Sequence, residues 1–164
     1  MADEANQTQN FEIKAKLRLD INRSLLAICF ALFGIIIAIQ PELLGQTPWL
    51  PIQLTLAIPL LFTSIFARSK LATARLPKMW EEYGFITFLI GYALLINVTG
   101  ILLSTKLSVH LGLIFLFSNI FISLVYSTLE VIETKSKLKT RLYKDSFFAL
   151  LILIGGILPS LGIF

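Results

Sequence analysis

Cysteine and histidine are almost absent from this 164-residue sequence, which has one of each, Cys29 and His110. A single cysteine excludes an intramolecular disulfide and a Cys-x-x-Cys redox or zinc motif, and a lone histidine supplies too few ligands for a metal site. Cys29 lies inside an apolar run, where it is expected to pack as a small helix residue. The sequence also lacks the glycine motifs that bind phosphates or dinucleotides. We therefore expect no metal and no cofactor.

Charged residues are also scarce. They form 15% of the chain, whereas 56% of its residues are apolar and thirteen are phenylalanine. A soluble domain has about 45–50% apolar residues even when glycine is counted, and one of this size cannot bury so many large side chains. The composition therefore excludes a disordered chain and a soluble fold. In a membrane protein the net charge of +4 is no sign of nucleic-acid binding, because the location of the charges matters more than their sum.

Five apolar runs are long enough to cross a bilayer, and their approximate ranges are 22–40, 49–67, 84–104, 109–132 and 147–164. They are expected to be helices, because backbone polar groups cannot remain unpaired in lipid. The sequence thus predicts an all-α, polytopic integral membrane bundle with five transmembrane helices in a membrane domain of residues 24–164. Pro59 and Pro159 are expected to kink the second and fifth helices.

Lysine and arginine are distributed unevenly among the connecting segments. Every one except Lys106 lies before or at the start of the first span, between the second and third spans, or between the fourth and fifth. Membrane proteins retain their positive charges on the cytoplasmic side. The sequence therefore predicts a cytoplasmic N-terminus and an external C-terminus, and the compact loops favour the inner membrane of a prokaryote.

Residues 1–23 are expected to form a cytoplasmic tail, of which residues 1–10 lack apolar periodicity and should be mobile. Apolar and polar residues alternate strictly over 11–21, which is the period of a half-buried strand. The chain offers no second strand for pairing, so a helix that continues into the first span is the favoured interpretation. A strand paired with another chain is the alternative.

Polar side chains inside the spans are few and mostly uncharged. Asn119, Ser123 and Ser127 recur every four residues on one face of the fourth span, and Asn97 lies at a similar depth in the third. Such groups either bond neighbouring helices together or line a path for a solute. We expect mainly the first role, with a direct or bridged bond between Asn97 and Asn119. Glycines 155–156 offer a further surface for close helix packing.

The basic segments on the predicted cytoplasmic side are candidates for binding anionic lipid headgroups. The residues singled out for this role are Arg68, Arg75, Lys78, Lys137 and Arg141. A basic collar that only sets the orientation and contacts headgroups is favoured over a docking site for a partner.

Three classes of function remain open. The favoured one is a non-enzymatic small multi-pass membrane protein that acts as an oligomeric or complex subunit, with a second copy or another membrane protein as partner. The second is a small channel or carrier with a polar path along the fourth span, and the third is a lipid-modifying enzyme that holds phosphate groups on its arginines. No charged residue lies at mid-depth in a span and no paired acids or nucleophile–base pair is apparent. Proton-coupled transport and intramembrane hydrolysis are therefore disfavoured.

Overall fold

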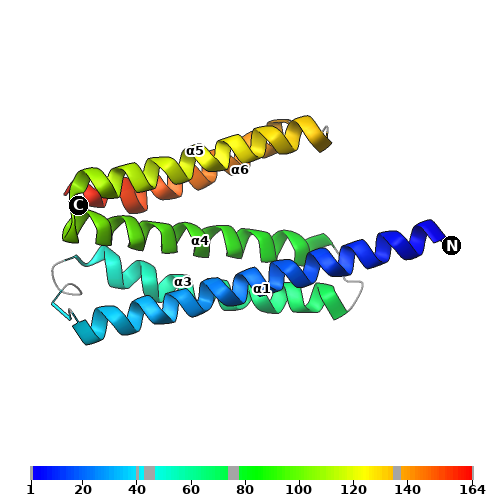
Figure 1. Cartoon of the computed structure of the whole chain (residues 1–164), viewed down its shortest axis with the longest axis horizontal. Helices are drawn as coiled ribbons and strands as arrows, with labels where there is room; N and C mark the ends of the chain where they lie inside the picture. The colour runs from blue at the N-terminus through cyan, green and yellow to red at the C-terminus, as the bar shows by residue number, and fades with distance from the viewer. Residues whose placement is uncertain (1, 40, 43–46, 74–77, 135–137, 164) are drawn as a thin grey trace. The chain divides into compact units, whose positions relative to one another are not determined.

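The computed structural model describes residues 2–39, 41–42, 47–73, 78–134 and 138–163, and nearly all of them are helical (Figure 1). The helices are α1 (Ala2–Ile39), α3 (Trp49–Thr73), α4 (Lys78–Lys106), α5 (Val109–Thr134), α6 (Leu138–Ile152), the π-helical segment η1 (Leu153–Ile157) and the short α7 (Leu158–Ser160). The stretches long and apolar enough to cross a membrane are Lys16–Ala38, Trp49–Lys70, Met79–Lys106, Val109–Ile132 and Arg141–Ser160. The predicted all-helical, multi-pass membrane fold with five transmembrane helices is thus confirmed.

The N-terminal segment is helical rather than extended. Helix α1 runs without a break from Ala2 through residues 11–21 to Ile39, so the strand alternative is wrong. The described part of the segment expected to be mobile, residues 2–10, belongs to the same helix. A helix pairs its backbone groups within the segment, whereas a lone strand leaves a row of them unpaired. The buried positions of α1 are Leu19, Asn22, Leu26, Cys29 and Ile36. Their spacing of three, four and seven residues is that of a helix face.

The fifth span begins earlier than predicted. It covers Arg141–Ser160, whereas the uncharged run predicted 147–164. Long basic side chains at the end of a span reach the headgroups while their stems stay in the apolar layer, so charge does not mark where the span begins. The π-helical segment η1 immediately precedes α7, which contains Pro159, whereas α3 continues as one helix through Pro59.

The described chain divides into two compact units, and the first consists of Met1–Gln40 and Leu56–Tyr92. Here α1 and parts of α3 and α4 are buried at positions that recur every three or four residues. On α3 and α4 these positions include Ala57, Leu61, Ser64, Arg68, Gly84, Thr87 and Gly91. Such spacing is typical of helices that pack side by side at a small angle, as in coiled coils.

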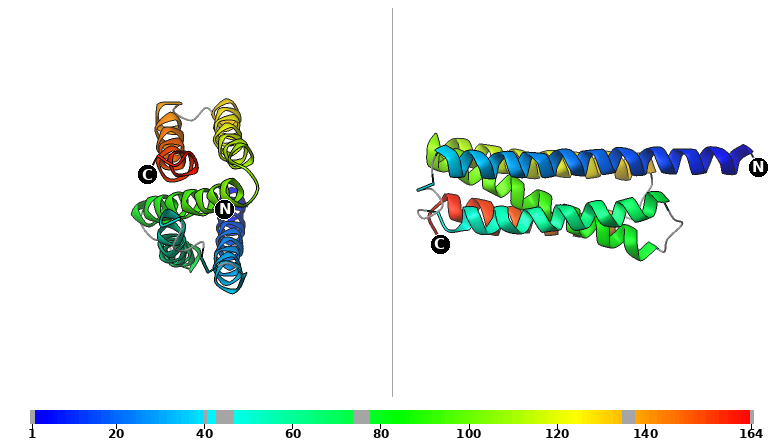
Figure 2. Two further views of the ribbon diagram at one scale, coloured as in Figure 1. Left: turned by 90° about the vertical axis from the view of Figure 1, so that its left-hand side faces the viewer. Right: turned by 90° about the horizontal axis from the view of Figure 1, so that it is seen from below.

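The second unit consists of Pro41–Thr55 and Ala93–Phe164. Within it α6 runs back beside α5 (Figures 1 and 2). Helices α4 and α5 approach closely through small residues: a Cβ atom on Gly112 would lie 1.9 Å from Ser104 Oγ and 2.6 Å from the carbonyl oxygen of Gly100. Although α5 makes this contact, it is the least buried of the five candidate spans. Most of its large apolar side chains are exposed.

Candidate functional site

A buried polar network joins three helices of the first unit; it consists of Asn22, Ser64, Arg68 and the carbonyl group of Gly84. Ser64 Oγ donates to the Gly84 oxygen at 2.7 Å and accepts from Asn22 Nδ2 at 2.8 Å, and Arg68 Nε donates to Ser64 Oγ at 3.4 Å. The oxygen and nitrogen of the Asn22 amide can also be exchanged. In that orientation the amide oxygen accepts from Ser64 Oγ and from Arg68 Nε at 3.2 Å. Either orientation fastens α1 to α3. Ser64 has one hydroxyl proton, so its bond to the Gly84 carbonyl, which fastens α3 to α4, belongs to the first orientation.

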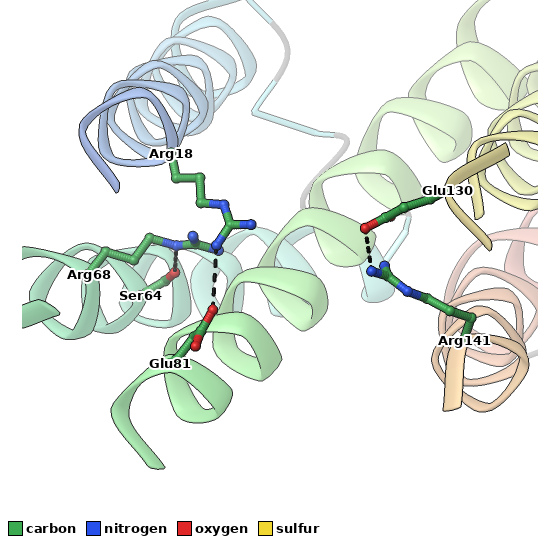
Figure 3. Close-up of polar contacts among 6 residues, drawn as sticks. All are labelled: Arg18, Ser64, Arg68, Glu81, Glu130 and Arg141. Carbon is green, nitrogen blue, oxygen red and sulfur yellow. Dashed lines mark hydrogen bonds and ion pairs between the residues drawn. The ribbon is translucent and has the colours of Figure 1, made fainter. Parts of the chain in front are cut away.

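Arg68 brings a positive charge into this network. The residue is only 9% exposed, and its guanidinium lies over the ring of Phe88, 5.3 Å from the ring centroid. Beside it, Arg18 of α1 and Glu81 of α4 form an ion pair with 3.7 Å between nitrogen and oxygen (Figure 3). The guanidinium group of Arg68 lies near this ion pair (Figure 3). Two guanidinium groups are thus found near one carboxylate.

A second cluster of polar groups lies in the second unit beside η1, and we call Gln53, Asn97 and Gly155 the amide cluster. Gln53 Nε2 donates to the carbonyl oxygen of Gly155 at 2.6 Å, and Asn97 Nδ2 donates to that of Leu151 at 3.1 Å. Pro159 has no N–H, so the carbonyl of Gly155, four residues earlier, lacks its α-helical donor. The Gln53 side chain supplies a donor in its place.

The two amide side chains leave their oxygens without a donor. Gln53 is 2% exposed and Asn97 is fully buried, and neither Oε1 nor Oδ1 has a hydrogen-bond partner in the described part of the chain. Their approach to η1 requires glycine. A Cβ atom on Gly155 would lie 2.4 Å from Asn97 Nδ2, and one on Gly156 would lie 2.6 Å from Asn97 Oδ1. The cluster therefore combines close helix packing with two unused acceptors.

Charged and polar groups of the second unit also join α5 to α6. Ser127 Oγ donates to Asp145 Oδ1 at 2.8 Å, and Arg141 forms an ion pair with Glu130 (Figure 3). All four side chains are at least partly buried. Since the Arg141 charge is balanced by Glu130, this contact fastens the two helices together.

The residues of the predicted polar ridge of the fourth span lie in different environments. Asn119 Nδ2 donates to the carbonyl oxygen of Phe115 in its own helix at 2.8 Å, whereas Asn97 donates to α6. The two amides thus bond to different acceptors, and the structure does not form the predicted direct bond between them. Ser127 is buried against α6, and Ser123 is half-buried.

The predicted headgroup residues differ in their environments. Arg68 lies in the buried polar network and Arg141 is paired with an acid. Arg75 and Lys137 lie outside the described residues, as does the side chain of Lys78. Headgroup binding by these residues stays a prediction.

Asn22, Gln53 and Ser64 were not predicted as site residues. A signal existed for Gln53, because it is a polar residue one turn inside an apolar span, in a chain where Pro159 deprives the Gly155 carbonyl of its donor. Asn22 and Ser64 carry no comparable signal, since a lone serine or asparagine near the end of a span fits an interfacial position equally well.

The groups gathered in the two clusters are amides, a hydroxyl and guanidinium groups, which suit helix packing and the binding of anions or hydrogen-bond donors. His110 is exposed near the start of α5, and Cys29 is buried. The described residues hold no group of three or more His, Cys, Asp or Glu side chains placed to bind a metal ion. No family model, curated protein or solved structure matches the chain.

Proposed function

We propose that the protein is a small non-enzymatic membrane subunit that assembles with a second copy of itself or with another membrane protein. One observation carries the proposal: several buried polar side chains of its spans are used to fasten its own helices. Ser64 and Gln53 each donate to a glycine carbonyl of a neighbouring helix, and Asn97 donates to a third carbonyl. Such bonds stabilise helix contacts in membranes by about 0.6–2 kcal/mol each.

Helix α5 is the surface that we assign to the partner. It is the least buried span, and it presents exposed Ser118 and half-buried Asn119 and Ser123 among its apolar side chains. Small and polar residues on a membrane helix favour contact with another helix, because they allow close approach and can bond across the interface. Lipid tails offer no partner for these groups, whereas a second helix does.

The proposal includes an orientation and a membrane. We place the N-terminus in the cytoplasm, the C-terminus outside and the chain in a prokaryotic inner membrane, with anionic lipids as partners on the cytoplasmic face. The distribution of lysine and arginine supports the orientation, since Lys106 alone of these residues lies on the opposite side.

A channel or carrier is the second candidate, and the amide cluster is the observation in its favour. The unpaired oxygens of Gln53 and Asn97 lie beside a π-helical segment, and irregular helices with free polar groups line the binding sites of many transporters. In that case the polar path follows α3, α4 and η1 rather than the fourth span.

Native mass spectrometry of the full chain, released from its membrane in minimal detergent, tests the proposal. A complex with another protein, or a homo-oligomer that Ser123→Leu disrupts, supports the subunit role on α5. Ala31→Leu, at an exposed small position of α1, is the matched control and should leave the complex intact. A strictly monomeric chain without protein partner contradicts the proposal, and a homo-oligomer insensitive to Ser123→Leu contradicts the assignment of α5.

A further inference from the structure

We propose that Arg18 and Arg68 together bind a phosphate group at the end of the first unit where α1, α3 and α4 meet. This inference deepens the lipid partnership included in the proposed function and rests on it, but it does not depend on the subunit role. It replaces a diffuse basic collar with one site of defined composition.

The charge balance of the site is the first argument. Arg18 and Arg68 each carry a positive charge, and Glu81 forms its ion pair with Arg18, at 3.7 Å, beside Arg68 (Figure 3). A charge taken out of water is costly unless an opposite charge and hydrogen bonds compensate it. Arg68 is 9% exposed and Glu81 forms its ion pair with Arg18, so the charge of Arg68 is incompletely compensated. An anion placed between the two guanidinium groups completes it.

The hydrogen-bonding capacity of Arg68 is the second argument. Of its five N–H donors, the Nε group is directed to Ser64 Oγ, and this is the hydrogen bond that Arg68 makes within the described part of the chain. The guanidinium group lies over the face of the Phe88 ring, which restricts its position. The terminal nitrogens are thus held in a fixed plane with donors unused, which is the arrangement that binds two oxygens of a phosphate.

The position along the spans is the third argument. Arg18 is two residues from the beginning of Lys16–Ala38, and Arg68 is two residues from the end of Trp49–Lys70. Both therefore lie where an apolar span meets the headgroup layer, at the level of lipid phosphates. A phosphate dissolved in the cytoplasm reaches the same level, so the chemistry fits both sources.

Three other cations near the ends of the spans are already engaged. Arg141 is paired with Glu130, and Arg23 lies 3.6 Å from Asp20. Lys70 rests over the ring of Trp80, 4.2 Å from its centroid. Arg18 and Arg68, which lie near a single acid, differ from these balanced groups.

The test measures how much phosphatidylglycerol the purified full-length protein retains in native mass spectrometry, with phosphatidylcholine as the zwitterionic comparison. Arg18→Gln and Arg68→Gln should each lower the retention of phosphatidylglycerol about ten-fold, the effect of losing one charge-assisted contact. Arg23→Gln, on the same helix as Arg18 and equally exposed to solvent, should change it less than two-fold. Glu81→Gln should raise retention, because it removes the competing carboxylate.

The opposite signs for Arg18→Gln and Glu81→Gln separate binding from a merely structural role, in which both changes break the same ion pair and act alike. Circular dichroism verifies folding, and the exposed Arg18 keeps the test decisive where Arg68→Gln does not fold. Displacement of phosphatidylglycerol by inorganic phosphate identifies a soluble phosphate as the ligand, and persistence identifies the lipid. The proposal is overturned if all four variants retain phosphatidylglycerol equally, or if the wild-type protein binds neither phosphatidylglycerol nor inorganic phosphate. Either result counts whatever the oligomeric state.

Discussion

Replacing Gln53 with leucine is expected to destabilise the protein by about 1–2 kcal/mol. The change removes the 2.6 Å bond to the Gly155 carbonyl, and an interhelical bond in a membrane contributes about 0.6–1.7 kcal/mol. It also leaves that carbonyl buried without a donor, at a cost of about 1–3 kcal/mol. Removal of the unpaired Oε1 atom offsets part of this loss, because an unpaired acceptor is itself unfavourable.

The physical cause is tested by combining this change with Pro159→Ala. Alanine restores the N–H that the Gly155 carbonyl lacks, so Gln53→Leu should cost less in that background, with a coupling energy of about 1 kcal/mol. The free energy of unfolding is measured by titrating SDS into mixed micelles and recording helicity by circular dichroism. Thr55→Val, at an exposed position of the same helix, should change it by less than about 0.5 kcal/mol. Equal costs of Gln53→Leu in both backgrounds would refute the role assigned to the proline.

Two further predictions concern helix packing and orientation. Gly112→Ala should destabilise by about 1–3 kcal/mol, because the new Cβ meets Ser104 Oγ and backbone at less than 3 Å, whereas Gly34→Ala meets nothing within 4 Å and should be neutral or stabilising in the same unfolding assay. Equal losses would show that helix contact is not the cause. An impermeant maleimide applied from outside should label Lys106→Cys and spare Arg75→Cys in intact cells; the reverse pattern would invert the orientation.

The number and type of elements were predictable because a membrane restricts the choices. Length and polarity suffice to identify a span, so 49–67 and 109–132 coincide with the observed helices α3 and α5 at their first residues. The boundaries drawn at charged residues were less accurate, as Arg141 shows, because long basic side chains extend away from the helix to reach water.

The alternation of apolar and polar residues at 11–21 suggested a strand, but only some of its apolar residues are buried. Leu19 and Asn22 are buried, whereas Leu17 and Ile21 are exposed. A strand pattern predicts that Leu17, Leu19 and Ile21 share one environment. The better signal was the interval of three and four residues that continues from Leu19 into the span, and it is visible only when a polar residue, Asn22, is accepted as buried.

The partners of polar residues were not predictable from depth. Asn97 and Asn119 were matched by their distance from the outer turn, but depth says nothing about which way a helix face points. Asn97 turned instead toward α6, where η1 and the glycines bring backbone carbonyls within reach. Predicting these partners requires knowing which helices are neighbours in space, and the sequence pattern does not show this.

Helix α3 shows how polar groups can specify register in an apolar bundle. Its buried positions recur every three or four residues, and among apolar residues such a face can slide by one turn with little change in burial. Ser64 and Gln53 remove that freedom, because each donates to one particular glycine carbonyl, that of Gly84 at 2.7 Å and that of Gly155 at 2.6 Å. A shift of one turn, about 5.4 Å, breaks both bonds at once and leaves two carbonyls unpaired. Ser64 and Gln53 therefore help to select this register of α3, in addition to the stability that their two hydrogen bonds contribute.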